Sequence, residues 1–242
     1  MSVIENISSF VSNTLRSKTV DDGASVSTGG ILEEGQIKAL YPPNLGWLQY
    51  KLKPTELEYV WRCIKNRKRN ASQHLAANIN SSYYLDDKND WFYINVLRGL
   101  MHRYAESFSN LGDRLPVIHR HPYCLNEWWV NYQKQGEFHP IHNHSGIYSF
   151  VLWMKIPTSY KDQIKHPLSM NSNTKVMSTF QFHYSNMLGQ MEPYRYCLSP
   201  EDEGVMLFFP SALKHEVYPF FNCDEDRISV AGNVNVNTSK IL

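Results

Sequence analysis

The stretch HPIHNHSGIYSFVLW, residues 139–153, places three histidines directly before a continuous apolar run. If these residues lie on a β-strand, His142 and His144 project to the same side, because side chains two residues apart share one face. Neutral imidazole is a ligand for iron, zinc, copper and nickel, and a catalytic site adds a third protein ligand while leaving positions open. The pair therefore predicts a metal site completed from another strand.

His215 is the strongest candidate for the third ligand. It follows the apolar run VMLFFP and a Pro-Ser turn, and it lies in another β-like run, KHEVYPF. Further along the chain, Arg227 and Ser229 in DRISVAGN are also two residues apart. A guanidinium inside a barrel needs an anion and matches a carboxylate with two parallel hydrogen bonds, and the serine hydroxyl can donate to the same group.

The elements that must position these residues fall into two groups. Residues 53–69 predict a helix that begins with a capping box of Thr55 and Glu58, and residues 89–112 predict a second helix that stops at Gly112. From about residue 123 the helical spacing disappears and short β-branched and aromatic runs alternate with turn signals. Strands are expected at about residues 123–132, 138–144, 146–156, 178–185, 193–198, 204–210, 213–220 and 226–236.

This order of elements predicts an α+β fold: a double-stranded β-helix, that is, a jelly-roll or cupin-like barrel, with the N-terminal helices packed on one sheet. Residues 1–45 are polar and rich in turn signals, so we expect a loosely ordered extension there. Residues 46–242 are expected to form one domain, with the barrel starting at about residue 123. Four large aromatics are expected to fill the barrel: Trp128, Trp129, Tyr148 and Trp153.

Composition narrows the possible partners. The net charge of +1 gives no general attraction to nucleic acid or to an anionic membrane. The four cysteines are far apart and show no paired zinc spacing, so reduced thiols are expected. The N-terminus lacks the pattern of a signal peptide, and no stretch has the length of a membrane span. We therefore expect a cytoplasmic protein with no membrane contact and no specific nucleic-acid binding.

Other histidines and one long loop carry weaker signals. His139 and His183 have no partner at ligand spacing, so we expect them to be structural or to support the ligands. His119 and His121 lie in a proline-containing connector and are expected to be solvated. The segment Pro157 to Met177 interrupts the strands and is long enough to be a lid or a substrate loop.

The arrangement of these motifs resembles the iron(II)- and 2-oxoglutarate-dependent oxygenases. The resemblance covers roughly residues 126–235. NYQKQGEFHPIHNH is similar to the family's strand-turn-strand segment around the first metal ligand, and EGVMLFFPSALKHEVYPF with EDRISVAGN is similar to its closing segment. The chain is most similar to the branch related to prolyl hydroxylases, which includes many phage-encoded oxygenases. If the protein is phage-encoded, the expected location is the cytoplasm of the host cell.

The resemblance implies a dioxygenase that uses Fe(II), 2-oxoglutarate and O2 to hydroxylate a C–H bond, with decarboxylation of 2-oxoglutarate to succinate. The substrate would be a peptide, with a peptidyl proline as the first candidate, or a small molecule. His142 and His215 would bind iron, and Arg227 with Ser229 would bind the distal carboxylate of 2-oxoglutarate. Tyr132 would add a phenol to the cosubstrate site.

The chain departs from the family at one ligand. Where the usual triad of two histidines and a carboxylate has its acid, this sequence has His144. We expect His144 to be the third ligand, with Glu137 and Asn143 as alternatives. Two other functions stay open: a cupin-like barrel that binds a metal for structure or for ligand recognition, which has no need of Arg227, and an assembly or host-interaction protein on a degenerate oxygenase barrel, which forms no succinate.

Overall fold

The computed structural model describes residues 18–19, 25–26, 34–38, 44–68, 70–72, 78–79, 81–114 and 121–239. The chain forms two compact units, Met1–Leu45 and Gly46–Leu242. In the first unit, β1 (Lys18–Thr19) pairs antiparallel with β2 (Ser25–Val26). Every described residue that the sequence singles out for chemistry lies in the second unit.

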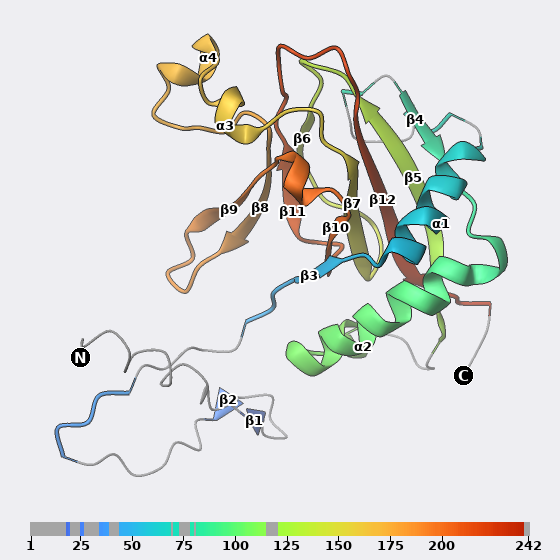
Figure 1. Ribbon diagram of the computed structural model, residues 1–242. Helices are drawn as coiled ribbons and strands as arrows, with labels where there is room; N and C mark the ends of the chain where they lie inside the picture. The colour runs from blue at the N-terminus through green and yellow to red at the C-terminus, as the bar shows by residue number, and fades with distance from the viewer. Residues whose placement is uncertain are drawn as a thin grey trace, which may run out of the picture. The chain divides into compact units, whose positions relative to one another are not determined.

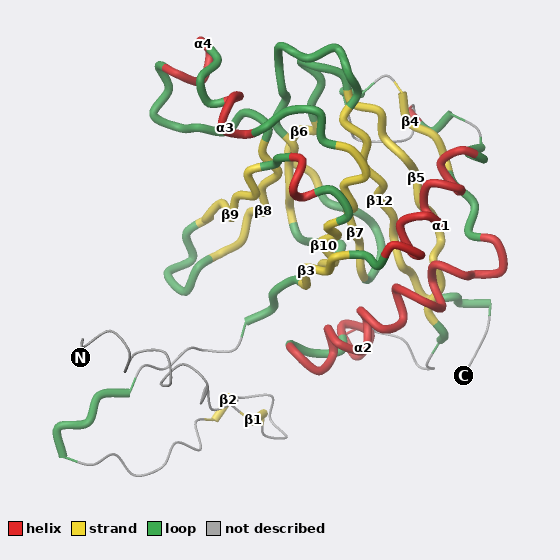
Figure 2. The backbone as a smooth tube through the Cα atoms, in the orientation of Figure 1, coloured by secondary structure: helices red, strands yellow, loops and turns green. Residues whose placement is uncertain are grey.

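The second unit contains two antiparallel sheets (Figures 1 and 2). The larger has the strand order β3-β10-β7-β12-β5-β4. Its strands are β3 (Leu48–Lys51), β4 (Ser81–Tyr84), β5 (Tyr123–Gln133), β7 (Tyr148–Lys155), β10 (Val205–Pro210) and β12 (Arg227–Val236). The smaller has the order β6-β11-β8-β9 and consists of β6 (His139–His142), β8 (Thr179–Ser185), β9 (Met191–Cys197) and β11 (Lys214–Val217).

Each of the eight runs that the sequence marks as a strand overlaps one of these strands, from β5 to β12. The two antiparallel sheets and the helices before them confirm the α+β, jelly-roll prediction. The sequence does not reveal β3 and β4, because LQYK and SSYY are short and lack an apolar alternation. Both lie at the edges of the larger sheet, where a strand needs fewer apolar contacts.

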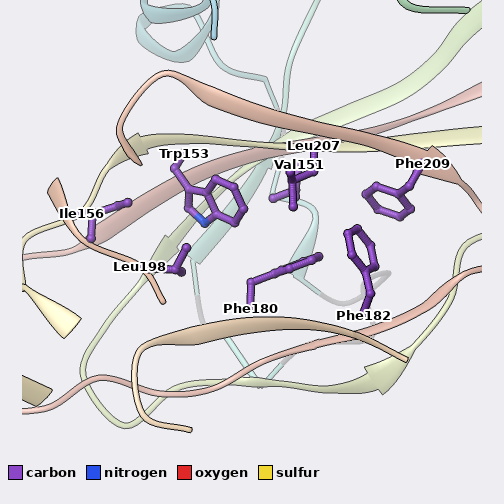
Figure 3. Packing of buried hydrophobic residues seen from close by; sticks show 8 residues of the cluster. All are labelled: Val151, Trp153, Ile156, Phe180, Phe182, Leu198, Leu207 and Phe209. Carbon is purple, nitrogen blue, oxygen red and sulfur yellow. The ribbon is translucent and has the colours of Figure 1, made fainter. Parts of the chain in front are cut away.

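A hydrophobic core rich in aromatic side chains fills part of the space between the sheets (Figure 3). Trp153 and Phe209 from the larger sheet face Phe180 and Phe182 from the smaller one, and the Phe182 and Phe209 ring centroids are 4.9 Å apart. All four side chains are almost fully buried. Each buried aromatic of this size contributes on the order of 2–3 kcal/mol by removal from water, so this core holds the sheets together.

Two helices cover the outer face of the larger sheet. They are α1 (Pro54–Lys65) and α2 (Arg98–Ser107), and a π-helical stretch, η3 (Tyr93–Leu97), leads into α2. Short 3-10 turns lie at η2 (Lys88–Asp90), η4 (Leu111–Arg114) and η5 (Pro200–Asp202). Phe92 stacks on Trp128 at 5.1 Å between ring centroids, and Tyr104 packs on Tyr148 at 5.2 Å. Trp128 and Tyr148 therefore face the helices, which corrects the prediction that they fill the barrel, while Trp129 and Trp153 face the other sheet.

The helix ends also differ from the sequence prediction. Helix α1 begins at Pro54 after the N-cap Lys53, and Glu56 rather than Glu58 completes the capping box by accepting a hydrogen bond from the Lys53 backbone N–H at 2.8 Å. Proline at the first helical position has its φ already set for a helix, so the start lies one residue before Thr55. Helix α2 ends at Ser107, before the predicted stop at Gly112.

The segment between β7 and β8 contains two single helical turns, α3 (Tyr160–Gln163) and α4 (Pro167–Met170). Gln163 joins it to the β11–β12 connection: its Nε2 donates to the Phe221 carbonyl and its Oε1 accepts from the Phe221 N–H, both at 2.8 Å. His166 stacks on the Phe221 ring at 5.0 Å. Elsewhere, no helix in the described ranges has the length and apolar character needed to cross a membrane.

Candidate metal centre

A cavity of about 440 Å³ opens between the two sheets. Strands β5 and β12 form its floor, because their register places Gln133 opposite Arg227 and Asn131 opposite Ser229. Strands β6 and β11 form the facing wall. The polar side chains that line it include Tyr84, Glu127, Asn131, Gln133, His139, His142, Asn143, His144, His215, Arg227, Ser229 and Asn233.

His142, His144 and His215 meet in this cavity. One ring nitrogen from each lies within 4.8 Å of the other two, which is the spacing of donors around one metal ion. The ring centroids are 4.3 Å apart for His142 and His215 and 5.0 Å apart for His144 and His215. Three imidazoles form a donor set suited to a transition metal, so the residues present fit the Fe(II) that the sequence predicts.

The backbone explains how the three histidines meet. His142 ends β6 and pairs directly with His215 on β11. His144 lies just after the end of β6, so its side-chain direction is not set by strand alternation as the sequence predicted. Its N–H donates to the Ser211 carbonyl at 2.9 Å, and this hydrogen bond holds the turn against the β10–β11 connection. The predicted pair is thus brought together by a strand end and a turn.

Hydrogen bonds orient two of the rings. Nδ1 of His142 lies 2.7 Å from the Pro140 carbonyl, and Nδ1 of His215 lies 3.0 Å from the Leu213 carbonyl. A carbonyl can only accept, so Nδ1 carries the proton in both rings and Nε2 keeps its lone pair. Metal-binding histidines are commonly oriented in this way, and here the bonds prepare both Nε2 atoms for a metal.

Burial keeps the triad neutral. It lowers the pKa of His144 to about 4, with a smaller effect from neighbouring His142, and it holds the pKa of His215 well below its ordinary value. His215 is 4% exposed and packs against the Phe180 and Phe209 rings at 5.6 and 5.0 Å. Only neutral imidazole binds a metal, so these apolar surroundings favour the ligand form.

Arg227 brings a buried positive charge into the same cavity. The side chain is 2% exposed and donates to Gln133 Oε1, to the Tyr218 carbonyl and to Ser178 Oγ. All three acceptors are neutral, and no aspartate or glutamate of the described residues forms an ion pair with it. Burial lowers its pKa to about 9, which leaves it charged at neutral pH. Such a group calls for an anionic ligand.

The other predicted cosubstrate residues are separated by strand alternation. Ser229 follows Arg227 by two residues on β12 and lines the cavity with it. Tyr132 does not reach the cavity: it points to the opposite face of β5, where its ring contacts Tyr83 at 6.1 Å and the Arg67 guanidinium at 5.6 Å. Its neighbour Gln133 takes the cavity side instead.

The alternative third ligands do not join the triad. The Glu137 carboxylate accepts a hydrogen bond from the Lys134 N–H at 2.9 Å, within the β5–β6 turn. Asn143 lines the cavity, but its side chain is an amide and provides no imidazole, thiolate or carboxylate donor. In the described part of the chain, no carboxylate belongs to the group that holds His142, His144 and His215.

The remaining histidines fall in different places. His139 lines the cavity, whereas His183 points away from it and bonds Glu216 Oε1 at 2.8 Å through Nε2. His119 lies outside the described residues, and His121 lies in an irregular stretch before β5. No residue of the segment Pro157 to Met177, which the sequence suggests as a lid, lines the cavity in this structure.

The sequence did not identify Gln133, which accepts two of the hydrogen bonds of Arg227. Its signal was available in principle, since Gln133 is a polar residue at the end of an apolar strand and two residues from Asn131. Such a pair on one strand shares a face. Without the register between β5 and β12, however, nothing shows that this face meets Arg227.

Comparison with known proteins identifies the family of this region. Residues 127–233 match the family model described as "Putative 2OG-Fe(II) oxygenase". No curated protein sequence matches the chain. The matched segment contains the three histidines of the triad as well as Arg227 and Ser229.

Several solved structures are similar to the chain at low sequence identity. A prolyl-4-hydroxylase from Pseudomonas putida is 14% identical with a TM-score of 0.45, over 80% of this chain and 94% of its own. An oxidoreductase of the 2OG-Fe(II) oxygenase family from Burkholderia pseudomallei is 12% identical with a TM-score of 0.48, over 78% and 85%. HygX from Streptomyces hygroscopicus, with nickel, 2-oxoglutarate and hygromycin B bound, is 10% identical with a TM-score of 0.42, over 80% and 84%. At sequence identities this low, none of them indicates a substrate for this chain.

The family match and the geometry of the site agree. The family uses Fe(II), 2-oxoglutarate and O2, and the cavity offers three metal-binding imidazoles together with one buried cation that has no acidic partner among the described residues. Residues 127–233 of this chain therefore belong to the 2OG-Fe(II) oxygenase family.

Proposed function

We propose that this protein is a 2-oxoglutarate-dependent dioxygenase that hydroxylates a C–H bond and converts 2-oxoglutarate to succinate. One observation carries the proposal: the charge of Arg227 is buried in the same cavity as the histidine triad and is surrounded by neutral acceptors only. A structural metal site needs no such charge. A dicarboxylate cosubstrate that binds the metal at one end and Arg227 at the other satisfies it.

In this proposal the cavity residues have separate roles in binding the metal and the cosubstrate. His142, His144 and His215 would hold Fe(II), and the bound metal with 2-oxoglutarate and O2 would supply the oxidising chemistry. Arg227 and Ser229 would bind the distal carboxylate. Phe180 and Phe209 close the side of the cavity behind His215 and exclude water there. Exclusion of water protects reactive species and strengthens the charged contact with the cosubstrate.

Three neutral ligands change the charge of the site. A triad with a carboxylate would cancel one of the two charges of Fe(II), whereas this triad cancels none. The dianion 2-oxoglutarate is then the main source of negative charge near the metal. We therefore propose that His144 is a true third ligand and that metal and cosubstrate bind more tightly together than apart.

For the substrate we propose a chemical class. A cavity of about 440 Å³ is within the usual size of a small-molecule pocket, and Glu127, Asn143 and Tyr84 add polar groups to it. The kinship with prolyl hydroxylases makes a proline-containing peptide the first substrate to test, and small molecules come next. The four free thiols fit the proposed cytoplasmic location.

An anaerobic titration tests the proposal. Protein loaded with Fe(II) and then with 2-oxoglutarate should develop the visible charge-transfer absorption of a chelated 2-oxo acid, and admission of O2 should yield succinate. A cupin-like metal protein would bind Fe(II) without this absorption. A degenerate oxygenase barrel would give no succinate even with saturating Fe(II) and 2-oxoglutarate, and either result would overturn the proposed function.

A further inference from the structure

His139 is the fourth histidine that lines the cavity, and the metal and cosubstrate roles proposed above do not include it. It begins β6 and pairs with Val217 of β11, while His142 at the other end of β6 pairs with His215. Its ring stacks on that of His142, with centroids 5.7 Å apart and planes 27° apart. It does not belong to the group of donors around the metal position. His139 therefore lies beside the metal ligands without being one of them.

The ring nitrogens of His139 have no hydrogen-bond partner among the described residues, unlike those of several other histidines in this domain. His142 and His215 bond backbone carbonyls through Nδ1, and His183 bonds Glu216. His139 makes only the ring contact with His142 and lines the open cavity. An imidazole that lines a cavity and has no hydrogen-bond partner among the described residues keeps hydrogen-bonding capacity for a ligand.

The position of His139 along the cavity points to the kind of ligand. Val217, its strand partner, is followed by Tyr218, whose carbonyl accepts a hydrogen bond from Arg227 Nη2 at 2.8 Å. His139 thus lies on the wall that faces Arg227, between the metal ligands and the guanidinium. The imidazole of His139 carries at least one ring N–H, so it can donate a hydrogen bond to a ligand in the cavity.

We propose that His139 is a cosubstrate-binding residue whose ring N–H donates to the distal carboxylate of 2-oxoglutarate, the same carboxylate that Arg227 binds. It fills the role that the sequence assigned to the phenol of Tyr132, which lies on the other face of β5. The inference rests on the proposed function and adds one residue to it. Arg227 supplies the charge, and His139 supplies a directional donor from the opposite sheet.

Two substitutions separate this role from simple packing. His139→Phe keeps a flat ring that can stack on His142 but has no N–H, and His139→Asn restores a donor without the ring. His183→Phe is the matched control, because His183 lies on the same sheet but points away from the cavity to Glu216. Each variant is loaded with Zn(II), which supports no turnover, and its zinc affinity is measured first to show that the triad is intact.

Calorimetry with two ligands gives the readout. Loss of a hydrogen bond to a charged acceptor should raise the Kd of His139→Phe for 2-oxoglutarate roughly tenfold to a hundredfold. The Kd for 2-oxopentanoate, which has a methyl group in place of the distal carboxylate, should stay the same. His139→Asn should recover most of the 2-oxoglutarate affinity, and His183→Phe should match the wild type.

The outcomes distinguish this inference from the function on which it rests. Equal 2-oxoglutarate affinity in His139→Phe and wild type, or an equal loss for both ligands, would overturn the role of His139 while leaving the oxygenase proposal standing. If the wild-type zinc protein binds no 2-oxoglutarate and Arg227→Met changes nothing, the proposed function fails and the role of His139 fails with it.

Discussion

Arg227 directs two of its donors, Nε and Nη2, at a single acceptor, Oε1 of Gln133, at 3.1 and 2.8 Å. A carboxamide oxygen satisfies hydrogen bonds but carries no charge. The strand pair β5–β12 therefore positions the guanidinium rigidly and leaves its charge available to an anion from the cavity. Buried charges in proteins are usually paired, and among the described residues no carboxylate forms an ion pair with Arg227.

Replacement of Arg227 should weaken the binding of 2-oxoglutarate and spare the metal. Arg227→Met keeps most of the volume of the side chain but loses the charged contact, which costs roughly 2–5 kcal/mol of binding free energy by truncation. Calorimetry of 2-oxoglutarate with the zinc-loaded variant measures the loss, and Arg195→Met on β9 is the control. Unchanged 2-oxoglutarate affinity in Arg227→Met would remove this residue from the cosubstrate site.

Two variants of His144 test the three-histidine site. His144→Ala should cut iron affinity sharply, because a third ligand within 4.8 Å of the other two is lost. His144→Asp should rebuild the usual carboxylate triad and keep part of the turnover. Anaerobic iron titration gives the affinities, and succinate formation gives the turnover. A wild-type iron dissociation constant for His144→Ala would contradict the assignment of this ligand.

Cys63 predicts how stability changes at alkaline pH. Burial raises the pKa of its thiol in the folded protein to about 11, whereas a thiol in the unfolded chain has a pKa of about 8.5. Between these values the unfolded chain has lost a proton that the folded protein retains, so the free energy of unfolding falls as the pH rises. The contribution is complete below about pH 8.5.

Urea unfolding at pH 7 to 11 under reducing conditions measures this slope. Cys63→Ala should be less stable than wild type at pH 7 and should lose less stability on going to pH 11. Cys197→Ala, at an exposed position, should follow the wild-type curve. The same pH dependence in Cys63→Ala and wild type would show that other groups, such as buried tyrosines, account for the alkaline slope.

Two glycines predict opposite changes in stability. A Cβ atom at Gly232 on β12 would lie 2.7 Å from Phe150 Cζ and 2.7 Å from Trp128 Cβ, so Gly232→Ala should destabilise the fold by about 1–3 kcal/mol through overpacking. A Cβ atom at Gly99 on α2 meets no atom within 4 Å, and Gly99→Ala should stabilise the exposed helix by about 0.5–1 kcal/mol. Urea unfolding compares both variants, and equal effects would contradict the close packing of Phe150 and Trp128 around Gly232.

Local patterns predicted most of the elements. Alternating and continuous apolar runs marked the strands from β5 to β12, and apolar spacing marked both helices, because these signals lie within one stretch of chain. The edge strands β3 and β4 were not predicted, because they form by pairing with β10 and β5 and not through an apolar pattern of their own. The sequence also did not predict that Trp128 faces the helices, because that contact too joins distant parts of the chain.

The candidate site shows the same division. His142, His144, His215, Arg227 and Ser229 could be selected from residue type and order, and the structure brings them into one cavity. Tyr132 was selected and Gln133 was not, although they are neighbours. His139 was expected to be structural or to support the ligands, and its place in the cavity became evident only once β6 was paired with β11.

The sequence by itself determined which side chains can carry the chemistry and in what order they follow one another. Only the tertiary structure decided that Gln133 rather than Tyr132 meets Arg227 and that His139 shares the cavity with the triad. The physical reason is that strand faces alternate with a period of two, while the register between strands is set by contacts between distant parts of the chain. A shift of one residue in that register would turn every side chain of β5 to the other face.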